Sequence, residues 1–476
     1  MKQRISVLVA LLVVLSMVLS ACGGGAAPAA APAETAAATT AAAGETTATA
    51  EAAAAAPAAS GEAVTIEYRL WDANQLPAYQ ACADAFMKAN PNIKVNITQQ
   101  GWGDYWNNIQ TGMVAGTAPD IFTDHLAKYP EFAAKEQLVD IQPFIERDGV
   151  DTSVYLGQLK DLWGREGKQF GLPKDWDTIA IVYNQTAIDA AGVTVDDLNN
   201  TTWNLENGGS FGELIAKLSI DENGNNGLSP DYDPTKVKQY GLIINGAGEG
   251  YGQTEWSWLT ATTGWNAIDE LYATSYHYDD ERFINTIQWF ADGMKKGFIM
   301  PLEQVTSLGG SAAFNSGLGA LHSNGSWMIG DFVNNATFPF GFARLPEGPE
   351  GRKSMFNGLA DSIWTGSKHQ EEAWQVLKYL ASPECANTVG SFGVVFPAQQ
   401  SGVDAAVAAY KTKGLDVSAF TEQALDPKGT FLFPVTDHAS EISNIMRPVM
   451  ESIMLGQAKA ADVLPAANEQ VNALFQ

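Results

Sequence analysis

The stretch Gly171 to Asn184, GLPKDWDTIAIVYN, decides how the rest of the chain can fold. Its second half, Thr178 to Tyr183, is a short apolar run rich in β-branched residues, which predicts a buried strand rather than a helix. Pro173 has no amide hydrogen to donate, so we expect an irregular segment ahead of that strand. This segment carries side chains suited to ligand binding at a strand mouth: Lys174, Asp175, Trp176 and Asp177.

Upstream of this stretch, strand and helix patterns alternate. Alternating apolar residues predict strands at 66–70 and 93–97 and a third at 119–122, separated by helical patterns at 77–89 and 104–115. This order predicts an α/β fold with a largely parallel sheet. Ligands bind beyond the C-terminal strand ends of such sheets, and here those ends carry Trp71, Asp72, Trp102 and Asp124.

Downstream, Ser210-x-x-Glu213 predicts a capped helix, and residues 240–244 predict a strand. The following Asn-Gly-Ala-Gly-Glu-Gly-Tyr-Gly is not a dinucleotide fingerprint, because Tyr251 stands at the third glycine position. Acids and aromatics follow that strand, where a second lobe would face a cleft, and they include Glu249, Tyr251 and Trp256.

The N-terminus has the features of an export signal. Lys2 and Arg4 precede an apolar run, and Leu19-Ser20-Ala21-Cys22 predicts a lipoprotein signal peptide (1–22) in which Cys22 is lipidated. Residues 23–62 are mostly Ala, Pro, Thr and Gly without aromatic residues, which predicts a disordered tether. Residues 63–476 exceed the usual size of one hydrophobic core, so two domains are expected.

The net charge of −26 argues against nucleic acid and polyanionic ligands. No His/Cys spacing indicates zinc, and neither HExxH, G-x-S-x-G nor a P-loop lysine is present. We therefore expect no metal, no cofactor and no catalytic residue. A glycosidase carboxylate pair is defined by spatial separation rather than by spacing, so a secreted carbohydrate-active enzyme stays as the alternative. Asp221 to Asp233 resembles a calcium loop but lacks its glycine and glutamate, which leaves a surface turn as the other interpretation.

The chain resembles the family 1 extracellular solute-binding proteins, the maltose-binding-protein-like receptors of bacterial ABC importers. Besides GLPKDWDTIAIVYN, the resemblance is carried by KANPNIKV, GTAPDIF, Phe314-x-x-Gly317-x-x-Ala320-Leu321 with Gly325-Ser326-Trp327, and SKHQEEAWQVLKYL, where Ser367 and Gln370 would cap a helix. Leu321 stands where family members usually have Met. The resemblance implies a two-lobe periplasmic-binding-protein-like fold (type II), with residues 63–174 and 309–356 in lobe 1 and residues 177–305 and 361–476 in lobe 2. Residues 361–365 would cross back to lobe 2.

The resemblance also implies binding residues. It places Asp72, Asp177, Glu249, Tyr251 and Trp327 at sugar-contacting positions, with Trp327 on the first lobe and Asp177 at the mouth of the second-lobe strand. Strand-end position alone adds Trp102, Asp124, Trp176, Trp256, Asn357 and Trp364. Aromatic rings can stack on the apolar faces of sugars, and acids and amides can bind the hydroxyl groups.

Cys82 and Cys385 could pair in an exported protein. The family layout puts them in different lobes, where a bridge would lock a moving hinge, so we expect two buried free thiols. Functionally, the resemblance implies an extracytoplasmic, lipid-anchored monomer that captures a mono- or oligosaccharide between closing lobes and delivers it to the transmembrane subunits of an ABC importer, without bond-making chemistry.

Overall fold

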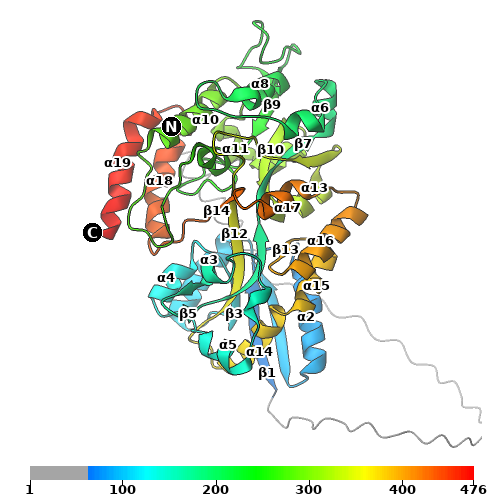
Figure 1. The fold of residues 1–476 in the computed structure, drawn as a ribbon, viewed down its shortest axis with the longest axis vertical. Coiled ribbons are helices and arrows are strands. Elements are labelled where there is room, and N and C mark those ends of the chain that lie inside the picture. The colour runs from blue at the N-terminus through cyan, green and yellow to red at the C-terminus, as the bar shows by residue number, and fades with distance from the viewer. Residues whose placement is uncertain (1–62) are drawn as a thin grey trace, which may run out of the picture. The chain divides into compact units, whose positions relative to one another are not determined.

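The structure, a computed structural model, describes residues 63–476, which lie within one compact unit. The signal peptide, Cys22 and the tether that the sequence predicts lie outside the described residues. Two mixed sheets organise the described part of the chain, each with its own helices, and we call them the first and second lobes (Figure 1). The predicted two-lobe α/β fold is confirmed.

The first lobe contains a seven-stranded sheet in the order β13-β6-β12-β3-β1-β2, with β14 paired to β12. The strands β1 and β2 are parallel, as are β1 and β3, as the alternating pattern predicts. The elements of this lobe are β1 (Val64–Leu70), α2 (Leu76–Ala89), β2 (Ile93–Gln99), α3 (Trp102–Ala115), β3 (Ile121–Asp124), α4 (Tyr129–Ala134), α5 (Gln142–Asp148), β4 (Gly164–Arg165), β5 (Lys168–Gln169), β6 (Leu172–Asp177), β12 (Ser354–Ile363), α14 (Gln370–Leu380), α15 (Pro383–Phe392), β13 (Phe396–Pro397), α16 (Gln400–Thr412) and β14 (Thr430–Leu432).

The second lobe contains a five-stranded sheet in the order β11-β7-β10-β9-β8. Helix α17 (Ser418–Leu425) contacts strands of both sheets. The elements of the second lobe are β7 (Ile179–Asn184), α6 (Gln185–Ala190), α7 (Val195–Asn199), α8 (Gly209–Leu218), β8 (Ile220–Asp221), β9 (Val237–Ile243), α9 (Ser257–Thr260), α10 (Glu281–Lys295), α11 (Leu302–Leu308), α12 (Gly310–Asn315), β10 (Gly319–Gly325), α13 (Ile329–Asn335), β11 (Phe340–Ala343), α18 (Ala439–Met454) and α19 (Ala460–Asn472).

The segment before β7 is a strand, not the irregular entry that the sequence predicts. Residues Leu172–Asp177 form β6, which pairs with β12 and β13. Pro173 is tolerated because the register of β12 shifts between Leu359 and Ala360, next to it. A strand can accommodate a residue without an amide hydrogen at such a bulge. The chain therefore leaves the first sheet at Asp177 and enters the second at Ile179.

The predicted lobe assignment of the second half of the chain is wrong in three places. Strand β10, expected in lobe 1, pairs with β7 and β9 in the second sheet. Strand β12, which contains the predicted crossing at 361–363, lies within the first sheet between β6 and β3. Helices α14 and α15 pack on α2 in the first lobe, whereas α18 and α19 pack on α10 in the second. Burial of apolar faces between helices distant in sequence decides these positions.

Neither predicted capping box forms. Helix α8 begins at Gly209, with Gly208 as its N-cap in the left-handed region. The Ser210 hydroxyl instead accepts a hydrogen bond from the Thr202 amide. Ser367 donates to Asp120 Oδ1, and His369 takes the N-cap position of α14. In both places a tertiary contact replaces the local motif.

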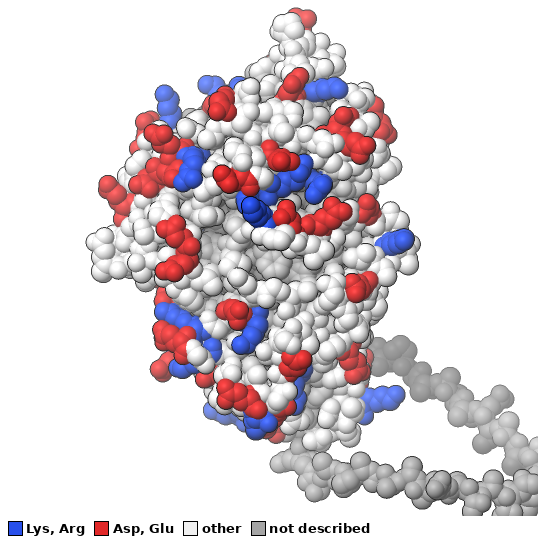
Figure 2. Space-filling view, in the orientation of Figure 1, with Lys and Arg blue, Asp and Glu red and all other residues white. Residues whose placement is uncertain are grey.

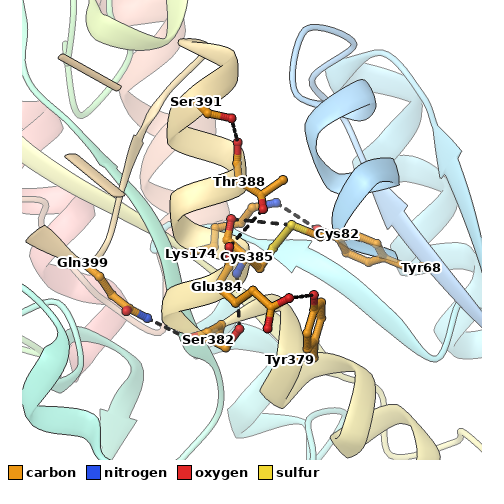
Figure 3. The surroundings of a disulfide bond; sticks show 11 residues. Tyr68, Cys82, Lys174, Tyr379, Ser382, Glu384, Cys385, Thr388, Ser391 and Gln399 are labelled. Carbon is orange, nitrogen blue, oxygen red and sulfur yellow. Dashed lines mark hydrogen bonds between the residues drawn. A yellow bond between two sulfur atoms is a disulfide. The ribbon is translucent and has the colours of Figure 1, made fainter. Parts of the chain in front are cut away.

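The two cysteines of the described chain are bonded, contrary to the expectation of free thiols. Cys82 on α2 and Cys385 on α15 form a disulfide with their Cα atoms 5.4 Å apart (Figure 3). Both residues belong to the first lobe, and α2 packs against α15. The bridge therefore does not cross the hinge. It joins the N-terminal and C-terminal contributions to a single lobe.

Candidate functional site

A cavity of about 1160 Å³ lies between the two lobes, next to the β6–β7 crossing. The first lobe lines it with residues from segments 71–75, 99–110, 125–128, 175–177 and 357–359. The second lobe lines it with residues from segments 245–255, 327–328 and 439–451. The segments after β1, β2 and β3 in the first lobe and after β9 and β10 in the second lie at the C-terminal ends of parallel strands, as the general rule for α/β sheets predicts.

An aromatic cluster forms the first-lobe wall of this cleft. The ring of Trp71, just after β1, packs edge-on against Trp102 with centroids 5.0 Å apart, and lies 5.6 Å from Trp106. His125 packs edge-on against Trp102 at 5.5 Å. Trp102 is 50% exposed, which is unusual for so large an apolar side chain. The cluster offers flat apolar surface to a ligand in the cleft.

Carboxylates of strand β6 form the floor of the cleft. Asp175 and Asp177 are two residues apart on β6 and therefore point to the same side of the sheet. Asp177 Oδ1 accepts a hydrogen bond from Gln253 Nε2 at 2.7 Å, and its Oδ2 accepts one from Asn357 Nδ2 at 3.3 Å. Burial raises the pKa of Asp175 to about 7 and the pKa of Asp177 well above its usual range. Burial also raises the pKa of Asp72.

Lys174, which directly precedes Asp175 in sequence, does not line the cleft. Its Nζ donates to Tyr68 Oη and to Thr123 Oγ1, both at 2.9 Å, and lies 3.6 Å from Asp361 Oδ1. The same ammonium lies 3.7 Å from the ring centroid of Tyr79. Lys174 therefore forms a buried ion pair behind the floor, where it holds strands β1, β3, β6 and β12 together.

The second lobe supplies the opposite wall from the loop after β9 and from α18. Glu249 and Arg447 form an ion pair with Nη2 and Oε1 2.7 Å apart. Tyr251 donates from Oη to the carbonyl of Ala439 at 2.8 Å and packs on Phe433 with ring centroids 4.9 Å apart. Trp327 follows β10, and its ring covers Gly325, where a Cβ atom would lie 1.8 Å from the ring.

Several buried polar atoms at the cleft have no hydrogen-bond partner among residues 63–476. They are Asp175 Oδ2, Asn357 Oδ1, Trp106 Nε1 and Trp176 Nε1, and all four residues line the cavity. Each of these residues is at most 6% exposed. Buried polar groups are usually hydrogen-bonded, so acceptors and donors left over at a cleft favour a ligand that supplies both.

Nine of the twelve predicted site residues line the cleft: Trp71, Asp72, Trp102, Trp176, Asp177, Glu249, Tyr251, Trp327 and Asn357. Two of them sit on the opposite lobe from the one expected. Trp327 follows β10 of the second sheet, and Asp177 ends β6 of the first sheet. The two residues still face one cleft, because each lies at the strand end nearest the other lobe.

Asp124 and Trp364 do not line the cleft. Asp124, the last residue of β3, is fully buried, and its Oδ1 accepts from the His125 amide. Strand β12 runs antiparallel to β3, pairing Ala360 with Asp124 and Ile363 with Ile121. The C-terminal end of β12 therefore lies at the end of the sheet away from the cleft. Trp364, which directly follows β12, lies there too.

Trp256 is also placed wrongly by sequence reasoning. It is 1% exposed, and its Nε1 donates to the Ala247 carbonyl at 3.0 Å. A Cβ atom on Gly248 or Gly252 would lie within 2.3 Å of its ring, and both glycines have positive φ. The glycine-rich loop therefore packs directly on Trp256, which supports the cleft wall from behind without contacting the cavity.

Sequence reasoning missed the contribution of α18 and most amides of the cleft. Ser440, Ser443, Asn444, Arg447 and Glu451 line the cavity from α18. The sequence around them has an ordinary amphipathic helical pattern, so no local signal separates them from a solvated face. Trp106 and Gln253 could have been found, because each is close in sequence to a predicted residue at a strand end.

The comparison with known families now decides the class of protein. The sequence profile of the family described as bacterial extracellular solute-binding protein matches residues 72–386. The chain belongs to this family. The sequence resemblance is thereby confirmed.

Individual relatives resemble this solute-binding protein in sequence, and a solved structure resembles it in fold. A protein of Brucella abortus (strain 2308) is 25% identical over 418 residues, which cover 85% of this chain and 92% of the relative. The maltotriose-binding protein of Pyrococcus abyssi is 22% identical over 339 residues, covering 68% of this chain and 63% of the relative. An ABC substrate-binding protein of Listeria monocytogenes in complex with cycloalternan has a TM-score of 0.74 at 20% identity, covering 87% and 99% of the two chains.

Among residues 63–476, no helix is both long enough and apolar enough to cross a membrane. Figure 2 shows acidic and basic side chains interspersed over the visible face, without an extended basic patch.

Proposed function

We propose that this solute-binding protein captures a sugar, a mono- or oligosaccharide, between its two lobes and delivers it to the transmembrane subunits of an ABC importer. The observation that carries the proposal is the composition of the cleft. Tryptophan faces line one wall, and buried carboxylates and amides with unused hydrogen-bonding atoms line the floor. Sugar rings have an apolar face that stacks on indole and hydroxyl groups that both donate and accept.

The relatives support the same ligand class. One is named as a maltotriose-binding protein, and the Listeria structure contains the oligosaccharide cycloalternan. A cleft of about 1160 Å³ has room for more than one sugar ring. Ligand contacts made by both lobes would favour the closed arrangement, which the membrane subunits would recognise.

We further propose that Cys22 carries a lipid anchor, that residues 23–62 tether the lobes to the outer face of the membrane, and that the protein acts as a monomer. The charged start, apolar run and Leu-Ser-Ala-Cys sequence support the anchor. Binding would occur without turnover, because the Asp177 carboxylate is held by the amides of Gln253 and Asn357 and the family consists of solute-binding proteins.

The test uses the mature chain and a saccharide panel in thermal-shift measurements, followed by isothermal titration of each hit. The proposal expects at least one saccharide to bind with a stoichiometry near one and to be recovered intact after prolonged incubation. Binding of no saccharide would contradict sugar capture. Steady release of a shorter sugar would instead favour the carbohydrate-active enzyme.

A further inference from the structure

The charges around the cleft are strongly unbalanced. Six carboxylates line it, from Asp72, Asp175, Asp177, Glu249, Glu255 and Glu451, against the two cations Lys128 and Arg447. Arg447 is already paired with Glu249, and Lys128 lies 6.0 Å from the ring centroid of Trp106. The floor acids therefore have no cation of their own inside the cleft.

Asp175 is the cleft acid whose charge is least compensated. It is 3% exposed, it lines the cavity, and its Oδ2 has no hydrogen-bond partner in the described chain. The Lys174 ammonium acts on Asp175 through space, but it is outside the cleft, where it donates hydrogen bonds to Tyr68 and Thr123 and lies 3.6 Å from Asp361, so it offsets the Asp175 charge only in part. A buried carboxylate without a paired charge is costly unless a ligand supplies the countercharge.

The groups next to Asp175 suit an organic cation. Asp72 influences the titration of Asp175 through space and directly follows Trp71 in the chain. The faces of Trp71 and Trp102 attract positive charge, since an aromatic ring carries negative potential above its plane. Among residues 63–476 no group of three metal-ligating side chains comes together, which argues against a bare metal ion as the missing charge.

From this arrangement we infer that the solute is a sugar carrying a protonated amine, with the ammonium held between Asp72 and Asp175 beside Trp71. The inference rests on the proposed sugar-binding function and narrows its ligand class. An analogue in which the amine is acetylated or replaced by a hydroxyl group keeps the sugar ring but loses the positive charge. The site would therefore distinguish the amino sugar from these analogues by charge as well as by shape.

The experiment compares matched sugars that differ only in the substituent at carbon 2 of each ring. The probes are glucosamine and galactosamine with their neutral parents glucose and galactose, and the β-1,4 dimer of glucosamine with the N-acetylglucosamine dimer and cellobiose. Isothermal titration should give at least tenfold tighter binding for an amino sugar than for its acetylated and hydroxylated counterparts. Raising NaCl from 20 to 500 mM should weaken the binding of the amino sugar severalfold and leave the binding of any neutral sugar unchanged.

Variants of the cleft acids test which carboxylates bind the ammonium group. Asp175→Asn and Asp72→Asn should each reduce the preference for the amino sugar over its neutral counterpart by at least fivefold. Glu303→Gln, which removes an exposed acid on α11 outside the cleft, should leave the preference unchanged. The salt dependence is measured on the unaltered protein, so the inference stays testable even if a floor variant fails to fold.

The outcomes separate the two proposals. If neutral sugars bind as tightly as their amino counterparts, or if salt affects both equally, the amine inference is overturned while sugar capture stands. If no probe of either kind binds, the amine inference is overturned together with sugar capture for these ring frameworks. A preference for the amino sugar that survives in both floor variants would overturn the assignment to Asp72 and Asp175.

Discussion

Gln253 Nε2 donates a hydrogen bond to Asp177 Oδ1 at 2.7 Å, and this bond joins the two lobes across the floor of the cleft. Asp177 ends the last first-lobe strand before the crossing, and Gln253 lies in the second-lobe loop that follows β9. Both residues line the cavity. Relative motion of the lobes therefore changes the environment of a buried carboxylate that lines the cleft.

We expect Gln253→Ala to weaken solute binding while leaving the fold intact. The variant removes a bond between the lobes and leaves Asp177 with Asn357 as its side-chain partner, so the closed arrangement loses about 1 to 3 kcal/mol. Titration calorimetry measures the affinity, and the melting temperature without ligand reports the fold. Gln80→Ala is the matched control, because Gln80 makes the same type of bond to Asp84 on an exposed helix face. Equal affinities for the two variants would contradict a role for the interlobe bond.

Trp327→Ala should reduce affinity by about 1 to 3 kcal/mol, on the scale of a lost stacking surface. Trp327 is only partly buried and lines the cavity, so the apo melting temperature should change little. Trp258→Ala is the contrasting variant, because Trp258 is fully buried in the second-lobe core and its loss should lower stability by about 3 to 5 kcal/mol. A sharp fall in the apo melting temperature of Trp327→Ala with unchanged affinity would place Trp327 in the core.

Gly325→Ala tests the support of the same ring. A Cβ atom at position 325 would lie 1.8 Å from the Trp327 ring, so the indole must move. We expect an affinity loss comparable to that of Trp327→Ala, together with a shift of the intrinsic fluorescence. Gly351→Ala serves as a control for a glycine with no atom within 4 Å, although its positive φ gives it a small stability cost. An unchanged affinity for Gly325→Ala would show that the ring is not held in a binding position.

Loss of the Cys82–Cys385 bridge should lower the free energy of unfolding by about 2 to 5 kcal/mol, because the bridge closes a very long loop in the unfolded chain. The measurement is denaturant unfolding of the paired variant Cys82→Ser and Cys385→Ser against the parent. Solute affinity should be retained, since neither cysteine lines the cleft. Mass analysis of alkylated, unreduced protein is the direct control, and two modified thiols at these positions would disprove the bridge.

Asp175 should make stability depend on pH in a defined direction. Burial raises its pKa to about 7 from an ordinary value of 3.8, so the folded protein keeps a proton that the unfolded chain releases. Stability from this group is therefore lost as pH rises through the window from 3.8 to 7. Asp175→Asn should thus stabilise the apo protein relative to the parent at pH 8, by on the order of 1 kcal/mol or more, and much less at pH 5.

His125 contributes to stability with the opposite pH dependence to that of Asp175. Comparing Asp175→Asn with the parent protein cancels this contribution, because His125 is present in both. Burial lowers the pKa of His125 to about 3, so its contribution is lost as pH falls below 6.5, in parent and variant alike. Melting temperatures of both proteins at pH 5, 6, 7 and 8 provide the measurement. A stability difference that does not grow between pH 5 and pH 8 would contradict the raised pKa.

The sequence predicted the parallel strands of the first lobe, the strand β7 and nine residues of the cleft. Local apolar patterns identified these strands, by alternation in the first lobe and by a continuous β-branched run in β7. Parallel strands place their C-terminal ends at a common edge of the sheet, so polar and aromatic residues just after such strands gather at one site. The same reasoning failed for Trp364, which follows β12. The local sequence pattern of β12 does not reveal that this strand runs antiparallel to β3, so its C-terminal end lies away from the cleft.

The sequence by itself determined the class of the protein and most of the residues that line its interlobe cleft, because both follow from local patterns and their order along the chain. Only the tertiary structure decided the pairing of Cys82 with Cys385, the lobe of Trp327, the burial of Trp256 beneath Gly248 and Gly252, and the arrival of α18 at the cleft. Each of these depends on which apolar faces bury one another across hundreds of residues, and that choice is made by packing over the whole molecule.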